Sequence, residues 1–196
     1  TDEQRRQIEL IERKADGISE MISQLLFLSR ADQGRQPLSQ EWLNLSELTE
    51  MTVEEQQMLS DEEGRGIRIE TQIRPDIYAW VDETFYIRIL TNLISNARRY
   101  SRDRGRVEVM LDAGEKEVTG VVQDHGTGIS EEALPHIWER FYRADVSRTD
   151  SSHSGLGLSM VKWIVNTHGG NIRAESSVGK GSRFLFVLPK EKNENL

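Results

Sequence analysis

Four short clusters of polar and glycine residues follow one another along the chain and constrain its fold more than any other feature. They are Asn92-Leu-Ile-Ser-Asn96-Ala-Arg-Arg99-Tyr100, Asp124-His-Gly126-Thr-Gly128, Gly155-Leu-Gly157-Leu and Gly179-Lys-Gly181-Ser. Each glycine pair alone is common in proteins that bind no ligand, although glycine lets a backbone lie close to another molecule. The four clusters in this order predict one nucleotide pocket, suited to ATP.

The first cluster lies on a predicted helix that Asp82 is placed to cap. Asn92 and Asn96 are one turn apart, so both amides project from the same face, and Arg99 follows one turn later. A side-chain carbonyl oxygen suits Mg²⁺, which takes its other ligands from water and substrate phosphates, so Asn96 is the candidate metal ligand. Alternatively, the two asparagines only cap or hydrogen-bond a neighbouring strand. The apolar face of this helix is predicted to be Phe85, Ile89, Leu90, Leu93, Ile94 and Ala97.

The second cluster follows an apolar strand. A carboxylate at Asp124 can accept a hydrogen bond from the exocyclic amine of adenine, while Gly126 and Gly128 allow the backbone to approach the ring. An ordinary turn after a strand explains the same pattern nearly as often.

The third cluster opens a predicted helix at residues 155–168, whose free N–H groups and dipole form an anion site suited to phosphates. The polar segment before it, residues 147–154, is predicted to be a mobile loop that folds over the nucleotide. Two common motifs are excluded: Met160 stands at the third glycine of a dinucleotide fingerprint, and Gly179-Lys-Gly-Ser182 lacks the spacing of a Walker loop.

Two arginines and two aromatic residues precede this loop in Glu139-Arg-Phe-Tyr-Arg143. In one interpretation Phe141 and Tyr142 anchor the loop on the core while the arginines stay solvated. In the other, Arg143 or Arg140 neutralises phosphate charge. The sequence leaves both open.

Apolar residues near the start of the chain recur in steps of three and four, as in a coiled-coil seam. This pattern predicts a long amphipathic helix that packs against a partner helix, although packing on its own domain is the alternative. Gly34 and Pro37 end the helix, and residues 32–40 form a predicted linker. The seam consists of Ile8, Ile11, Ala15, Ile18, Ile22 and Leu25.

The remaining periodicity predicts an α+β sandwich in which a mixed sheet of about five strands carries helices on one face. A further helix is expected at residues 45–60, with Asn44 or Ser46 as its cap. We expect a helical segment at 1–36, a globular domain at 37–189 and a polar tail at 190–196. The predicted strands are residues 67–73, 107–111, 118–123, 171–176 and 183–188.

Composition excludes several classes of function. A net charge of -8 disfavours nucleic acid as a partner, and no window approaches the roughly 20 apolar residues of a membrane span. The chain has no cysteine, which fits a reducing compartment, and its four histidines show no metal-ligand spacing. Thr1 in place of Met suggests a fragment of a longer protein.

The quoted clusters resemble those of bacterial sensor histidine kinases, whose catalytic part is shared with DNA gyrase, MutL and heat-shock chaperones of the ninety-kilodalton class. Residues 92–100 are similar to the asparagine box, 124–128 to the first glycine box and 139–143 to the phenylalanine box. The later glycine boxes match residues 155–157 and 179–181, and the similarity covers about residues 38–189. The phenylalanine box is typical of the kinase branch.

The resemblance implies a Bergerat-type ATP-binding fold that uses ATP and Mg²⁺. Asn96 would then bind Mg²⁺ with support from Asn92, Arg99 would lie near phosphate, Tyr100 beside adenine and Asp124 on the adenine amine. The residues that would be catalytic are Asn96, Arg99 and Arg143. Those that would contact the cofactor are Asn92, Asn96, Arg99, Tyr100, Asp124, Gly126, Gly128, Ile129, Gly155, Leu156, Gly157, Leu158 and Ser182.

The resemblance also implies partners. Residues 1–36 are similar to the second helix of the dimerisation hairpin, so the full-length protein is expected to be a homodimer that serves a response-regulator receiver domain. The expected location is the cytoplasmic side of a membrane sensor, with any membrane segment outside this sequence. Two departures from the family pattern stand out: His125 replaces an Asn, and no histidine lies in an H-E-x-x-T-P-like run.

Three functions follow from these expectations. The leading hypothesis is an ATP-dependent protein-histidine kinase core whose acceptor histidine is absent from this sequence. The second is a catalytically silent nucleotide-binding regulatory module. The third is an ATPase clamp, which needs an activating carboxylate close to Asn92, whereas Glu83 lies nine residues away.

Overall fold

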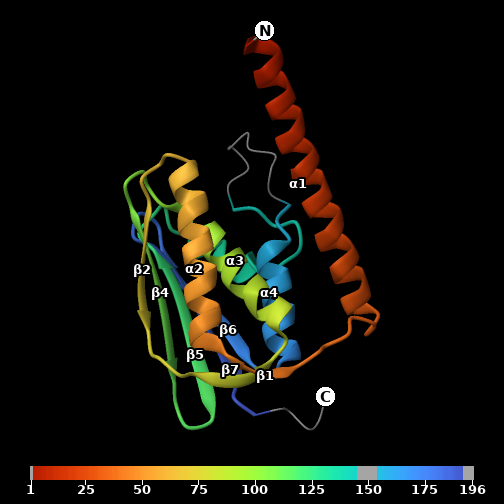
Figure 1. Ribbon diagram of the computed structural model, residues 1–196, viewed down its shortest axis with the longest axis vertical. Helices are drawn as coiled ribbons and strands as arrows, with labels where there is room; N and C mark the ends of the chain where they lie inside the picture. Colours follow the sequence, from red (N-terminus) through yellow and green to blue (C-terminus); the bar gives the residue numbers. More distant parts are fainter. Residues whose placement is uncertain (1, 145–153, 192–196) are drawn as a thin grey trace.

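The computed structural model describes residues 2–144 and 154–191 (Figure 1). The predicted mobile loop at 147–154 therefore lies outside the described residues except for Ser154, and most of the predicted tail lies outside them too. The helices are α1 (Asp2–Asp32), α2 (Leu45–Glu62), α3 (Glu83–Tyr100), the short 3₁₀ helix η1 (Leu134–His136) and α4 (Gly157–Thr167). The strands are β1 (Glu41–Asn44), β2 (Arg68–Ile73), β3 (Tyr78–Val81), β4 (Arg106–Ala113), β5 (Glu117–Asp124), β6 (Asn171–Ser177) and β7 (Gly181–Pro189).

Five strands form a mixed sheet in the order β2-β4-β5-β7-β6. Only β2 and β4 run parallel, and every other pair is antiparallel. Helices α2, α3 and α4 cover one face of this sheet (Figure 1). The predicted α+β sandwich with helices on one face is confirmed.

Strand register already assembles part of the site. Gln123 of β5 lies opposite Arg183 of β7, so Asp124 at the end of β5 lies beside Ser182 at the start of β7. The second and fourth clusters, which are more than fifty residues apart in sequence, are thereby brought together by one antiparallel pair.

A second, two-stranded sheet of β1 and β3 was not predicted. Each strand has four residues, too few for the alternation of apolar residues to be recognised. Ala79 and Val81 are fully buried on its inner side, whereas Trp42, Tyr78 and Trp80 are exposed on the outer side.

Helix α3 is the central helix of the domain. All six residues of its predicted apolar face are buried, and the Asp82 carboxylate accepts a hydrogen bond from the Phe85 N–H at 3.1 Å, which confirms the predicted cap. The other oxygen of Asp82 accepts the N–H of Ser39, so the same side chain fixes the linker before β1. Asn44 is the cap of α2.

His168 joins the end of α4 to the start of α3. Its Nδ1 donates to the Ile164 carbonyl at 2.8 Å, and its Nε2 accepts the Asp82 N–H at 3.1 Å. The side chain is 1% exposed, and burial lowers the pKa of His168 from its usual value of 6.5. A proton on Nε2 would face the Asp82 N–H, so the neutral ring is the form that fits.

Acidification is therefore expected to destabilise the domain through His168. The unfolded chain takes up a proton near pH 6.5 while the folded chain does not, so stability falls as the pH drops below that value, by up to about 1.4 kcal/mol per pH unit. Urea unfolding of the wild type and of His168→Gln at pH 7.5 and 5.5 measures this. The variant should be less stable at pH 7.5 but lose less on acidification; parallel losses would contradict the assignment.

Among the described side chains of helix α1, those buried against the domain lie near its C-terminal end. Phe27, Leu28 and Ala31 are buried, and the Phe27 ring packs edge-on against Phe85 and Trp163 at centroid distances of 5.5 and 5.1 Å. The residues of the predicted seam are exposed, which favours packing against a partner helix over packing on the domain. Among the described helices, none combines the length and hydropathy needed to span a bilayer.

Candidate functional site

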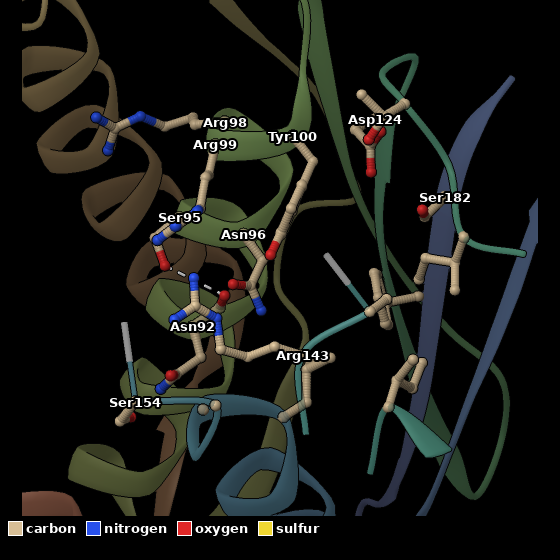
Figure 2. Close-up of a pocket in the computed structure, with 18 of the residues that line it drawn as sticks. Asn92, Ser95, Asn96, Arg98, Arg99, Tyr100, Asp124, Arg143, Ser154 and Ser182 are labelled. Atoms are coloured by element: carbon tan, nitrogen blue, oxygen red, sulfur yellow. Dashed lines mark hydrogen bonds between the residues drawn. The ribbon is translucent and has the colours of Figure 1, made fainter. Parts of the chain in front are cut away.

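A pocket of about 1050 Å³ opens between α1, α2, α3, the loop after β5 and the start of α4 (Figure 2). Asn92, Asn96 and the last turn of α3 lie on one side, and Asp124 and Ser182 lie on the other. The predicted site residues that line it are Asn92, Asn96, Arg99, Tyr100, Asp124, Gly128, Ile129, Arg143, Gly155, Gly157, Leu158 and Ser182.

Two asparagines of α3 have different surroundings. The Asn92 amide donates to the Arg88 carbonyl at 2.8 Å, and its Oδ1 faces Gly157, where a Cβ would lie only 2.6 Å away. Asn92 thus packs against the start of α4. The Asn96 side chain makes no hydrogen bond within the described part of the chain and lines the pocket, so its carbonyl oxygen is available to a ligand.

Asp124 is a buried carboxylate, with 3% of the residue exposed. Its Oδ1 accepts the Gly126 N–H at 2.8 Å. Burial raises the pKa of Asp124, while the N–H groups of Gly126 and Ser182 and the nearby His125 lower it in part. A buried carboxylate with lone pairs left over is a strong and selective acceptor for an N–H of a ligand.

The glycines of the second and fourth clusters have a role that the sequence analysis did not predict. A Cβ at Gly126 would lie 1.9 Å from the Tyr100 carbonyl oxygen, and one at Gly181 would lie 2.0 Å from the Asp124 carbonyl oxygen. Gly181 also has a φ of 91°, a conformation that favours glycine. These glycines are required because protein loops approach one another here.

Two of the predicted cofactor contacts are absent from the lining of this pocket. Gly126 does not line the pocket, since it packs against the backbone of Tyr100. Leu156 is fully buried in the hydrophobic core. It anchors the start of α4 from beneath, so its side chain cannot reach a nucleotide.

The two segments that flank residues 145–153 make different contacts with the rest of the protein. Arg143 lines the pocket, whereas Arg140 forms two hydrogen bonds to the Asp32 carboxylate at the end of α1. The structure thus separates the two arginines that the sequence left equivalent. Ser154 donates to Gln24 of α1 at 2.6 Å, so α1 contacts both flanks of the loop.

The aromatic residues between these arginines are also distinct. Tyr142 packs against the core, but Phe141 is 58% exposed and has a φ of 63°. Of the two aromatic residues in the first interpretation, Tyr142 therefore packs on the core, whereas the Phe141 ring is exposed and its N–H donates to the Gly155 carbonyl. His125 also points away from the pocket, and its Nε2 lies 2.9 Å from Glu108.

Several pocket residues were missed. Met21 and Gln24 come from α1, Gln56 and Leu59 from α2, and these are placed by tertiary packing that leaves no local signal. Thr127 was recognisable, since it stands between two predicted glycines.

Residues 81–192 match the family described as histidine kinase-, DNA gyrase B- and HSP90-like ATPases. The chain is 35% identical over 190 residues to the sensor histidine kinase RppB of Synechocystis sp., a match that covers 91% of this chain and 39% of the relative. The resemblance stated from the sequence is thereby confirmed.

Solved structures agree with this relationship. The mycobacterial sensor histidine kinase MprB is 27% identical with a TM-score of 0.68, and the match covers 78% of this chain and all of that one. Full-length ShkA, solved with AMPPNP, has a TM-score of 0.81 at 24% identity over 98% of this chain and 40% of that chain, which shows the shared fold. The chain spans 29% to 39% of the length of the first three curated relatives.

Proposed function

Since this chain belongs to the family of histidine kinase-, DNA gyrase B- and HSP90-like ATPases, we propose that it is the ATP-binding catalytic part of a sensor histidine kinase. The chain binds ATP, and the γ-phosphoryl group of ATP is transferred to a histidine outside this sequence. An aspartate of a response-regulator receiver domain then takes the phosphoryl group.

The observation that carries the proposal is the placement of Asp124 across the pocket from Asn96. A buried carboxylate that accepts N–H groups suits the adenine amine, and an amide oxygen without a protein partner suits a hard cation. A buried carboxylate and a free amide oxygen are each common in proteins. Here they lie on opposite walls of one pocket, an arrangement that fits the adenine and phosphate ends of ATP.

The phosphate end is assigned to α3, α4 and Arg143. Asn96 holds Mg²⁺ through its carbonyl oxygen, and the ion, when bound, offsets phosphate charge. Arg99 and Arg143 both line the pocket and place positive charge near the phosphates, while Gly157 begins α4 and leaves N–H groups free for an anion. In phosphoryl transfer these residues mainly position the group and stabilise its charge.

The acceptor histidine is assigned to a segment outside the described pocket. His125 bonds to Glu108, His136 lies beside Glu139 on the surface, and His168 is buried between α3 and α4. His153 lies outside the described residues. None of the four stands in the sequence setting of a phosphoacceptor.

The domain division belongs to the same proposal. Residues 1–36 serve as the second helix of a dimerisation hairpin and residues 37–189 as the catalytic domain. The exposed seam of α1 supports a second copy of the hairpin as its partner. The resemblance to sensor histidine kinases is also the reason for assigning this domain to the cytoplasmic face of a membrane sensor.

Calorimetric titration of a non-hydrolysable ATP analogue with Mg²⁺ tests the proposal directly. Binding by the wild type supports it. No binding by a folded wild-type chain would leave the silent regulatory module as the better assignment, and rapid release of inorganic phosphate from ATP would favour the ATPase clamp.

We predict that the chain binds ATP but does not stably phosphorylate itself, because none of its four histidines stands in the sequence setting of a phosphoacceptor, and the three that the structure describes bond to Glu108, Glu139 and Ile164. Incubation with γ-labelled ATP, followed by acid treatment, checks this. The expected result is no acid-labile label on the protein. A stoichiometric acid-labile phosphoprotein would show that one of the four histidines is an acceptor.

A further inference from the structure

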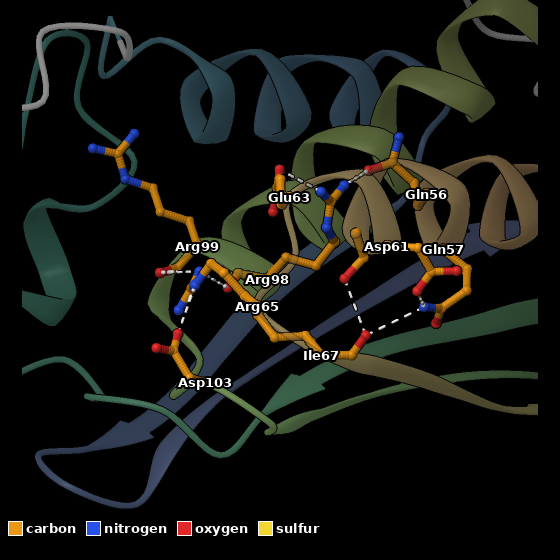
Figure 3. Close-up of polar contacts among 10 residues, drawn as sticks. Gln56, Gln57, Asp61, Glu63, Arg65, Ile67, Arg98, Arg99 and Asp103 are labelled. Carbon is orange, nitrogen blue, oxygen red and sulfur yellow. Dashed lines mark hydrogen bonds and ion pairs between the residues drawn. The ribbon is translucent and has the colours of Figure 1, made fainter.

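We infer that the turn after α2, residues 63–66, positions the adenine side of the pocket through Arg65. This inference rests on the proposed ATP site. Figure 3 shows the turn against the C-terminal end of α3, with Arg65 and Glu63 directed toward Arg98 and its neighbours. We call residues 63–66 the α2–β2 turn.

Arg65 binds the backbone where α3 ends. Its Nη1 donates to the Arg98 carbonyl at 3.0 Å, its Nη2 to the Ser101 carbonyl at 2.6 Å and its Nε to the Asp103 carboxylate at 2.8 Å. The last carbonyls of a helix have no intrahelical partner, and they carry the negative end of the helix dipole. One guanidinium thus caps α3 and fixes the path of the chain beyond it.

The side chain of Arg98 is held by the same region. It is 5% exposed and donates to Gln56 of α2 at 3.0 Å and to the Glu63 carboxylate. Arg98 is therefore bound at its side chain by Glu63 and at its carbonyl by Arg65, two residues of one turn. This double contact ties the last turn of α3 to α2 and to the turn that follows it.

The α2–β2 turn is itself well fixed. Ser60 donates to the Ile67 carbonyl at 3.0 Å, and the Ile69 N–H donates to Gln57 at 2.8 Å. On the other side, the Arg104 N–H donates to the Arg65 carbonyl at 2.8 Å. The turn is tied to α2, β2 and the loop after α3, so it can hold α3 in place.

The end of α3 is in turn connected to the adenine loop. The Thr127 N–H donates to the Tyr100 carbonyl at 3.1 Å, and Gly126 packs against that same carbonyl. Thr127 and Tyr100 line the pocket, and Gly126 donates its N–H to Asp124. A displacement of the Ser101 carbonyl would therefore also displace Tyr100. Through the Thr127 hydrogen bond it would displace the loop that carries Asp124.

Arg65 does not touch the pocket, so its part in binding is to position Tyr100 and Thr127. Among the residues that the structure describes, only Arg65 bonds side chain to backbone at this helix end. Arg68 offers a control, because it is an arginine three residues from the half-buried Arg65 but is exposed, and its side chain makes no hydrogen bond or ion pair to α3 among the described residues.

The experiment compares Arg65→Met, Arg65→Lys and Arg68→Met with the wild type. Calorimetry gives the affinities for non-hydrolysable ATP and GTP analogues with Mg²⁺. Arg65→Met should weaken ATP-analogue binding by about tenfold, the effect of about one hydrogen bond, with a smaller loss for the GTP analogue. The ratio of the affinity for the ATP analogue to that for the GTP analogue should therefore fall. If Arg65→Met only reduced the amount of folded protein, the apparent affinities for the two analogues would fall by the same factor. Arg65→Lys keeps one contact and should be intermediate, and Arg68→Met should match the wild type.

A second measurement needs no nucleotide. Hydrogen exchange of the Thr127 amide, followed by NMR, should be faster in Arg65→Met and unchanged in Arg68→Met. If wild-type ATP binding fails, the proposed function is wrong, while the exchange result still tests the positioning role. If ATP binds and both Arg65 variants keep wild-type exchange at Thr127 and wild-type adenine preference, the inference is overturned. Should Arg65→Met not fold, the Arg65→Lys comparison decides by the same two measurements.

Discussion

Replacement of Asp124 by alanine is expected to weaken binding of an ATP analogue by about ten- to a hundredfold. The substitution removes the proposed acceptor for the adenine amine, and a hydrogen bond to a charged group contributes roughly 1.5–3 kcal/mol. It also leaves the N–H groups of Gly126 and Ser182 without their buried acceptor. Each unsatisfied buried group costs about 1–3 kcal/mol of folding stability, in the free and the bound protein alike. The loss of affinity comes from the missing bond to the adenine amine, for which about 1.4 kcal/mol is a factor of ten. Calorimetry at neutral pH measures the loss.

Asp124→Asn is the matched control, because it keeps the shape of the side chain while it removes the negative charge and replaces one acceptor oxygen by an NH₂ donor. Its amide nitrogen cannot accept the N–H groups that the carboxylate accepts. We therefore expect Asp124→Asn to bind the ATP analogue with an affinity between those of the wild type and Asp124→Ala. Its preference for the ATP analogue over the GTP analogue should be smaller than that of the wild type. Wild-type affinity in a folded Asp124→Ala protein would remove Asp124 from the adenine site.

The residues of α3 show how much of this site is readable from sequence. Its apolar face, its Asp82 cap and the face shared by Asn92 and Asn96 all follow from helical periodicity, which is a local property. The structure adds that Asn92 faces Gly157 while Asn96 faces the pocket. This distinction depends on where α4 lies, so one helix considered alone could not provide it.

The glycines show why the rest could not be predicted. Their spacing predicted that another group lies close to the backbone at each glycine. Which group this is depends on the long-range register of β5 with β7 and on where α3 ends. Gly126 and Gly181 meet protein backbone, and Leu156 turns into the core. Arg65 belongs to no recognised cluster, and its contacts join residues more than thirty positions apart. Sequence pattern identified the pocket but could not distinguish residues that contact its contents from residues that position its walls.

Asn96→Ala is expected to remove the Mg²⁺-dependent part of nucleotide binding. The variant lacks the Asn96 amide oxygen, which lines the pocket and accepts no hydrogen bond from the described residues, so the ion loses its proposed protein ligand. Titration of the ATP analogue in Mg²⁺ and in EDTA separates the two contributions: the wild type should bind more tightly with Mg²⁺, and the variant should bind equally in both. Transfer to a supplied histidine-bearing segment should fall by about 10²-fold or more, as when one preorganised charge-stabilising group is removed.

Two neighbours make this prediction specific to Asn96. Ser95 lines the same wall, but its hydroxyl bonds to the Asn92 carbonyl at 3.2 Å, so Ser95→Ala should keep the wild-type response to Mg²⁺. Asn96→Asp retains an oxygen ligand and adds negative charge beside the phosphates, which should preserve part of the Mg²⁺ response while weakening binding in EDTA. If Asn96→Ala keeps the full Mg²⁺ response, the ion is bound through phosphates and water alone. The unpartnered amide of Asn96 would then contact the nucleotide directly, and the metal would need no ligand from this helix.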